Sequence, residues 1–215
     1  MVEKMLYLVR HGESVANTEG IYQGQTYDTP LSELGQRQAN ALGDRLRDIQ
    51  IDRLITSPLT RTRQTADAIA KWHAEVSVEV EPKIIETNHG DWEGNAIGAI
   101  RDRWTREYAL WQSAPSQAAF PGGETFAQTR MRTMDWWNEL LPAVYGTTVV
   151  VTHDNIIRSL LVDLLAMDPD KMWNIELQPA AITTIYLKGD EVKVSAVNDT
   201  KHLEGLRSNL ANHAL

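Results

Sequence analysis

Cysteine is absent from the 215-residue sequence. The chain therefore forms no disulfide bond, uses no thiolate nucleophile and holds no cysteine-ligated zinc or iron–sulfur cluster. Long apolar runs are also missing: none approaches the roughly 18 residues of a membrane span, and the N-terminal apolar stretch is too short for a signal peptide. We therefore expect a cytoplasmic protein without a membrane partner.

Basic residues are fewer than acidic residues. Lysine and arginine together number 21 against 29 aspartates and glutamates, which gives a formal net charge of -8. A nucleic-acid-binding protein normally needs a basic face for phosphate contacts, so no nucleic-acid partner is expected. Any anionic substrate must instead be attracted by a local group of cations.

Linker-like sequence is missing as well. No long stretch rich in proline, glycine or serine divides the chain, and 42% of its residues are hydrophobic. A chain of this length and composition can bury one substantial core. The sequence therefore predicts a single domain over residues 1–215.

Short apolar segments alternate with segments of helical periodicity along most of the chain. Strand, polar turn and helix recur, which is typical of a mostly parallel sheet between helices in an α/β fold. The last two strand-like segments flank a short polar turn and predict an antiparallel hairpin at one edge. The expected strands are residues 5–9, 53–56, 76–85, 148–152, 182–187 and 192–197, and the expected helices are residues 32–49 with Ser32 as N-cap, 58–71 and 155–166.

Residues 95–141 do not fit this alternation. Apolar side chains that recur every three or four residues predict one amphipathic helix over residues 97–111 and another over residues 134–141. A glycine-containing loop joins them, and such a helical insertion suits a lid over an active site. In the alternative reading, its tryptophans only seal the helices onto the domain.

Arginine and histidine side chains lie at the expected carboxyl ends of three strands. Arg10 and His11 follow the first strand, Arg61 lies in the helix after the second, and His153 follows the strand at 148–152. In a parallel sheet these ends share one edge, so the side chains can converge on one tetrahedral anion. Further candidates near this edge are the carboxylate of Glu86 and the hydrogen-bond donors of Asn17, Gln23 and Gly24.

The order and spacing of these residues resemble the histidine phosphatase superfamily, the phosphoglycerate mutase-like proteins. The resemblance covers nearly the full chain, and its most specific part is residues 8–14, LVRHGES, with Asn17. It is reinforced by Gln23-Gly24, residues 30–32, residues 57–66, Glu86, residues 150–153 and residues 198–203. The resemblance implies a three-layer α/β/α fold, a transient phosphohistidine on His11, and no obligatory metal or other cofactor.

Phosphoryl transfer gives each of the main candidates a chemical role. A neutral imidazole can attack phosphorus, so His11 is the expected nucleophile. Arg10 and Arg61 carry planar, permanently charged donors that would hold the nonbridging phosphoryl oxygens. Glu86 would protonate the departing alcohol in the first step and act as the base for water in the second. By resemblance, His153 donates to the same oxygens.

The remaining candidates are assigned to positioning or to structure. By resemblance, Asn17, Gln23 and Gly24 position the phosphoryl oxygens. Arg63 is the rival of Arg61, and Glu93 is the rival of Glu86. A bracing or structural role is expected for Glu13, His73, His89 and Glu124.

Asp154 departs from the resemblance, because proteins of this type usually carry glycine after the second histidine. We place it among the candidate substrate-binding residues, where it could tune specificity. A carboxylate repels phosphate unless it is turned away, and Asp154 also precedes the helix expected over residues 155–166. We therefore favour a role in capping the free N–H groups of that helix.

The candidate residues are compatible with two reactions, hydrolysis of a phosphate ester and transfer of the phosphoryl group to another position, as in a mutase. A mutase needs further cations for a bisphosphorylated intermediate, and acidic residues are interspersed among the arginines of the insertion. We therefore expect a phosphomonoester hydrolase acting on a small phosphorylated metabolite, with phosphoglycerate mutase-type transfer as the alternative. A catalytically inactive phosphate-binding module is the alternative from another class. A homodimer is left open, because Trp72, Trp173 or the last strand could pair two copies.

Overall fold

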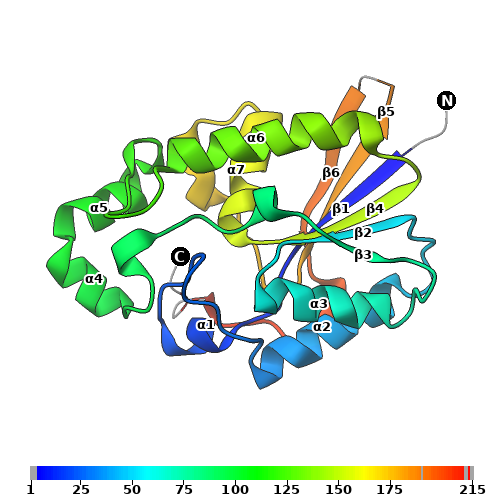
Figure 1. Ribbon diagram of the computed structural model, residues 1–215, viewed down its shortest axis with the longest axis horizontal. Coiled ribbons are helices and arrows are strands. Elements are labelled where there is room, and N and C mark those ends of the chain that lie inside the picture. Colours follow the sequence, from blue (N-terminus) through cyan, green and yellow to red (C-terminus); the bar gives the residue numbers. More distant parts are fainter. Residues whose placement is uncertain (1–3, 190, 211–212, 214–215) are drawn as a thin grey trace.

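The computed structural model describes residues 4–189, 191–210 and 213, and its centre is a six-stranded sheet (Figure 1). The strand order is β3-β2-β4-β1-β5-β6. Neighbouring strands run parallel from β3 to β1, whereas β5 runs antiparallel to both β1 and β6. The expected sheet with an antiparallel hairpin at its edge is thus confirmed. The strands are β1 Lys4–Arg10, β2 Arg53–Thr56, β3 Val78–Val80, β4 Thr147–Thr152, β5 Ile182–Lys188 and β6 Glu191–Asp199.

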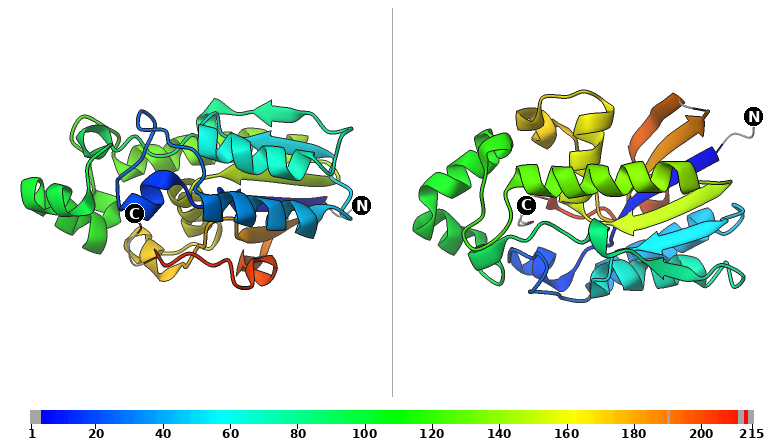
Figure 2. Two further views of the ribbon diagram at one scale, coloured as in Figure 1. Left: turned by 90° about the horizontal axis from the view of Figure 1, so that it is seen from below. Right: turned by 45° about the horizontal axis from the view of Figure 1, so that its top comes forward.

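Helices cover both faces of the sheet and make three layers (Figure 1 and Figure 2). α2 and α3 pack on one face, and α6 and α7 pack on the other. α4 and α5 project beyond the ends of the strands, at the left of Figure 1. The helices are α1 Val15–Glu19, α2 Glu33–Leu46, α3 Thr60–Ala70, α4 Ile97–Arg103, α5 Thr105–Ser113, α6 Phe126–Ala143 and α7 Asp154–Leu164.

The alternation of side chains along β1 explains why both faces are covered. Leu6 and Leu8 belong to the core under α6 and α7, whereas Tyr7 and Val9 pack in the core under α2 and α3. A central parallel strand is buried on both faces and therefore reads as a nearly continuous apolar run. The same strand ends at Arg10, which brings the first functional residue to the carboxyl edge of the sheet.

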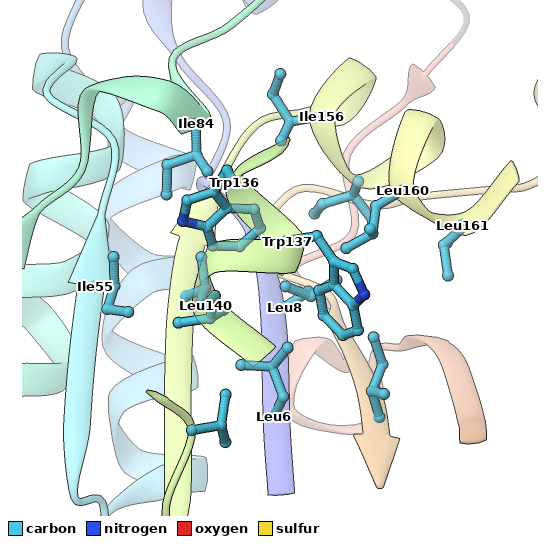
Figure 3. Close-up of a cluster of buried hydrophobic side chains, with 14 of the residues drawn as sticks. Leu6, Leu8, Ile55, Ile84, Trp136, Trp137, Leu140, Ile156, Leu160 and Leu161 are labelled. Carbon is cyan, nitrogen blue, oxygen red and sulfur yellow. The ribbon is translucent and has the colours of Figure 1, made fainter. Parts of the chain in front are cut away.

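Helix α6 belongs to the main layers, although its residues were expected to form the second half of the lid. Trp136, Trp137 and Leu140 are buried against Leu6 and Leu8 of β1 (Figure 3). An amphipathic helix buries one face whether it covers a site or a sheet, so its apolar spacing does not distinguish the two. The helices that stand clear of the sheet are α4 and α5.

The helix expected over residues 97–111 is two helices. α4 ends at Arg103 and α5 begins at Thr105, because Trp104 leaves the helical conformation with φ -125° and ψ 51°. The apolar spacing continues across the break, so Ile100 and Trp111 are buried in one aromatic cluster. The periodicity predicted the buried face and missed the break.

Two other expected boundaries were wrong because of prolines. β3 is shorter than the strand expected over residues 76–85, since Pro82 begins a 3-10 helix and has no N–H to donate to a ladder. Leu59 is the N-cap of α3, so Pro58 lies before the helix and not in its first turn.

The outer surface bears on membrane contact and on self-association. Within the described ranges, no helix has the length and apolar character needed to cross a membrane. Of the features considered for a homodimer, Trp173 packs against Trp111 inside the subunit, whereas Trp72 is half exposed. A homodimer through Trp72 or the edge strand β6 stays a prediction.

Candidate active site

Side chains from distant parts of the chain meet in one cavity at the carboxyl edge of the parallel strands. The cavity has a volume of about 20 Å³, little more than one water molecule needs. It is lined by Arg10, His11, Asn17, Gln23, Arg61, Glu86, His89, Asp154 and Asn155. Most of the residues expected at this edge are thus brought together, which is the outcome that parallel strand ends predict.

His11 is buried and its tautomer is fixed by the backbone. Its Nδ1 lies 2.7 Å from the carbonyl oxygen of Gly12, which can only accept, so Nδ1 carries the proton. Burial, with the guanidinium groups of Arg61 and Arg10, holds the pKa of His11 well below its usual range. The ring is therefore neutral near pH 7, and its unprotonated Nε2 accepts a hydrogen bond from Nε of Arg61 at 3.3 Å.

Two buried guanidinium groups flank this imidazole. Arg61 donates to the carbonyl oxygen of Gly24 at 3.1 Å and pairs with Asp28 at 3.2 Å. Arg10 donates to the carbonyl oxygen of Leu177 at 2.5 Å. Both side chains are 1% exposed, so they are held rigidly beside the cavity. Gly24 does not itself line the cavity, and its carbonyl oxygen helps to hold Arg61.

Glu86 is a buried carboxyl group at the same cavity. Its Oε1 accepts a hydrogen bond from the backbone N–H of Thr87 at 2.8 Å. Burial raises its pKa to about 7, despite the opposing effects of that bond and of Arg61. A carboxyl group with this pKa is protonated in a large part of the population near neutral pH, as a general acid requires.

Glu93, the rival of Glu86, braces a loop. Although burial raises its pKa, the hydrogen bonds that it accepts lower the pKa overall, so it stays ionised. Its two oxygens accept from backbone N–H groups of Gln25, Thr26, Tyr27 and His89. These bonds leave Glu93 without the proton that the first step needs, and Glu86 is the better candidate.

His153 lies directly behind His11. The two ring centroids are 5.3 Å apart, and Nε2 of His153 lies 2.7 Å from Oγ of Ser57. Burial, together with the charge of Arg61, holds the pKa of His153 well below its usual range. Nδ1 has no hydrogen-bond partner among the described residues. The role of His153 as a donor to phosphoryl oxygens stays a prediction.

Asp154 does not cap α7, so the favoured expectation was wrong. The N-cap is His153, with no capping side chain, and Asp154 is the first helical residue. The carboxylate of Asp154 instead forms ion pairs with Arg158 and with Nη1 of Arg10, the latter at 3.2 Å. These pairs offset the repulsion that a carboxylate would otherwise exert on phosphate in this cavity.

His89 and Asn155 line the cavity, although neither was predicted there. Nδ1 of His89 donates to the carbonyl oxygen of Gln23, so its Nε2 accepts from Nδ2 of Asn155 at 3.2 Å. Burial lowers the pKa of His89 to about 4, which keeps this tautomer neutral. Oδ1 of Asn155 is left as an acceptor without a partner among the described residues. In the sequence, only their closeness to predicted site residues could have indicated this, since His89 comes three residues after Glu86 and Asn155 two after His153.

The arginines of the insertion do not enter the cavity. Arg130 pairs with Asp163, and Arg132 pairs with Glu124 and donates to the carbonyl oxygen of Glu86 at 2.9 Å. Arg132 and Glu124 therefore hold the backbone that carries Glu86. In the described part of the chain, no group of three or more histidine, aspartate and glutamate side chains is placed to hold a metal ion.

Gly35 lets the loop after β1, which carries His11, pack against the first turn of α2. A Cβ at Gly35 would lie 1.9 Å from the carbonyl oxygen of Glu13, and one at Gly12 would lie 2.6 Å from the carbonyl oxygen of Gly35. Both neighbours are backbone atoms, which cannot move aside as a flexible side chain can. The loop after β1 is therefore positioned by contact of backbone with backbone.

We predict that Gly35→Ala lowers the free energy of unfolding by about 1–3 kcal/mol, the usual cost of overpacking, and lowers activity because the loop carrying His11 must shift. The measurements are denaturant unfolding and hydrolysis rates. Gly98→Ala is the matched control, since this glycine is also helical and a Cβ there meets nothing within 4 Å. Equal stability of the two variants would contradict the packing argument.

Comparison with known proteins gives matches over most of the chain. The family model described as histidine phosphatase superfamily (branch 1) matches residues 6–200. The chain is 33% identical over 199 residues to phosphoserine phosphatase 1 of Hydrogenobacter thermophilus, which covers 92% of this chain and 93% of that protein. It is 29% identical over 205 residues to a 2,3-bisphosphoglycerate-dependent phosphoglycerate mutase of Nitrobacter hamburgensis, with 92% and 99% covered. The solved structure of Bacillus stearothermophilus YhfR superposes with a TM-score of 0.88 at 27% identity and covers 93% of this chain and 98% of that chain.

Proposed function

The chain belongs to the histidine phosphatase superfamily, and from this membership we propose that it hydrolyses a small phosphomonoester, without a metal, through a phosphohistidine on His11. The observation that carries the proposal is the neutral His11 imidazole, whose unprotonated Nε2 contacts the guanidinium of Arg61 in a cavity that Arg10 also lines. Fixed cations beside the nucleophile can stabilise the charge of the transferring phosphoryl group, a role that metal ions fill elsewhere.

The first step forms the phosphohistidine. Nε2 of His11 forms a bond to phosphorus while the ester P–O bond breaks, and Glu86 gives its proton to the departing alkoxide oxygen. Nδ1 of His11 keeps its own proton, because it donates to the carbonyl oxygen of Gly12. The leaving group departs as a neutral alcohol.

The second step returns the enzyme to its starting state. A water oxygen forms a bond to phosphorus as the N–P bond breaks, and the ionised Glu86 takes the proton from that water. Inorganic phosphate is released, His11 recovers its lone pair, and Glu86 is protonated again. Arg10 and Arg61 hold the same phosphoryl oxygens in both steps.

The lining of the cavity supports a phosphoryl-binding pocket. All the residues that line it are polar or charged, with Arg10 and Arg61 beside His11, which suits an anionic phosphoryl group better than an apolar leaving group. Oδ1 of Asn155 is an acceptor at the wall of the cavity, which suits a substrate that carries a hydroxyl or ammonium donor.

The distribution of cations favours hydrolysis over mutase chemistry. A bisphosphorylated intermediate needs cations for its second phosphoryl group, and the cationic side chains that line the cavity are Arg10 and Arg61. Arg130 and Arg132 are occupied by Asp163 and Glu124. The phosphoserine phosphatase of Hydrogenobacter thermophilus, which this chain resembles at 33% identity, makes phosphoserine the first substrate to test.

We expect the purified protein to hydrolyse phosphoserine or a comparable small phosphomonoester in the presence of excess chelator. The measurement is phosphate release across a panel of phosphoserine, phosphoglycerates, sugar phosphates and nucleotides. Rapid quenching in alkali, in which phosphohistidine survives, should trap a phosphorylated enzyme. Strong stimulation of phosphoglycerate interconversion by a bisphosphoglycerate primer would identify a mutase instead, and no turnover of any ester would favour the phosphate-binding module.

A further inference from the structure

A buried carboxylate at the wall of the cavity joins two buried arginines. Oδ1 of Asp154 lies 3.2 Å from Nη1 of Arg10 and 3.3 Å from Nη2 of Arg158. The three side chains are between 1% and 4% exposed. In this environment a charged group is held tightly to its partners, because losing a partner leaves an uncompensated buried charge. The position of Arg10 therefore depends on Asp154, and that of Asp154 on Arg158.

Arg158 is in turn fixed by the segment that follows α7. Its Nη1 donates to the carbonyl oxygens of Met172, at 2.9 Å, and of Ile175. Its guanidinium carbon lies 5.0 Å from the centre of the Trp173 ring, within the range of a cation–π contact. The position of Arg158 therefore depends on that of Trp173, which it contacts directly.

Trp173 makes the last contact, to the projecting helix α5. Its Nε1 donates to the carbonyl oxygen of Trp111 at 2.9 Å, and the two rings meet edge to face with centroids 5.0 Å apart. Trp111 is fully buried and also contacts Phe120 and Phe126. A continuous chain of contacts therefore runs from α5 to the phosphoryl-binding arginine Arg10.

We propose that Asp154 and Arg158 are positioning residues, which hold the guanidinium of Arg10 where it can bind the phosphoryl group. Through Trp173, the position of this guanidinium also depends on the position of α5. The proposal rests on the proposed function in one respect, that Arg10 binds phosphoryl oxygens. Nε of Arg10 has no hydrogen-bond partner among the described residues. Part of its guanidinium is thus free for an anion, while Asp154 and the carbonyl oxygen of Leu177 both hold its Nη1.

The test is a double-mutant cycle read by the affinity for inorganic phosphate, measured by calorimetry. Asp154→Asn keeps the shape of the side chain and removes its charge, and Trp173→Leu removes both the ring over Arg158 and the bond to α5. Each single variant should weaken phosphate binding about tenfold. The double variant should bind no more weakly than Asp154→Asn alone, because the contact from Trp173 reaches Arg10 only through Asp154.

Two further variants separate this arrangement from a general loss of structure. Trp72→Leu is the matched control, since Trp72 also lies beside an arginine, with the guanidinium carbon of Arg47 at 5.9 Å from its ring, but is half exposed and takes no part in the contacts from α5 to Arg10; its phosphate affinity should equal that of the unmodified protein. Trp173→Phe keeps a ring over Arg158 and loses only the bond to Trp111, so it should weaken binding about threefold.

Additive losses in the cycle, or unchanged affinity in Asp154→Asn, would overturn the positioning role. Unchanged affinity in Trp173→Phe would remove α5 from the proposal. Because phosphate binding is measured without turnover, this test is independent of the test of the proposed function. If the cycle shows coupling but the protein hydrolyses no ester, the positioning role stands and the proposed function is wrong. If the protein is an active phosphatase but the cycle is additive, the proposed function stands and the positioning role is wrong.

Discussion

Replacing His11 by alanine is expected to lower kcat/KM for phosphomonoesters by about 10⁴-fold or more, the scale seen when an enzyme loses its nucleophile. The variant should also fail to retain phosphate after an alkaline quench. The physical reason is that the unprotonated Nε2 of His11 lies at the cavity beside the guanidinium of Arg61, whereas Nε2 of His153 is engaged with Ser57.

His73→Ala is the matched control for this variant. His73 lies in the turn after α3, outside the cavity lining, and its replacement should leave the rate within about twofold of the unmodified protein. Thermal unfolding of both variants would show that the fold is retained. Substantial turnover by a folded His11→Ala protein would mean that another group attacks phosphorus, and the proposed reaction would have to be abandoned.

The convergence of the main site residues was predictable from the sequence because it depends on backbone topology. Strand–turn–helix repeats specify parallel neighbours, and parallel neighbours place their carboxyl ends at one edge. Arg10 and Arg61 needed only that rule to come together, since Arg10 ends β1 and Arg61 lies in the first turn of the helix after β2. The same reasoning placed Glu86 near them.

The features that were missed depend on side-chain direction. An aspartate before a helix caps it in many proteins, but Asp154 turns to Arg10, which lies far earlier in the chain, and to Arg158, which lies one turn along α7. His89 reaches the cavity through the carbonyl oxygen of Gln23, a contact between loops. Local patterns carry no information on such long-range partners. The break at Trp104 was hidden for a similar reason, because both halves bury the same apolar face.

Glu86→Gln is expected to lower kcat for alkyl phosphates by about 10²- to 10⁴-fold, because glutamine cannot protonate the departing oxygen. The leaving group of an aryl phosphate is a stabilised phenolate that needs little protonation, so the rate of the first step should fall much less for aryl esters. The measurement is kcat for an alkyl and an aryl ester with each protein. Glu93→Gln is the control and should not produce this dependence on the leaving group, since Glu93 is held by backbone N–H groups of a loop.

The pKa of Glu86 also makes the effect of this replacement on stability depend on pH. Its folded-state pKa is raised from 4.5 to about 7, chiefly by burial, so between these values the unfolded chain has released the proton and the native protein still holds it. The stabilisation from Glu86 is therefore full below about pH 4.5 and is lost as the pH rises to about 7, a change of about 3 kcal/mol. Glutamine does not titrate. The free energy of unfolding of Glu86→Gln, relative to that of the unmodified protein, should therefore rise by about this much between about pH 4.5 and pH 8. Denaturant unfolding at the two pH values measures the difference, and a difference that does not change with pH would show that Glu86 is ionised in the native state and unfit to be the general acid.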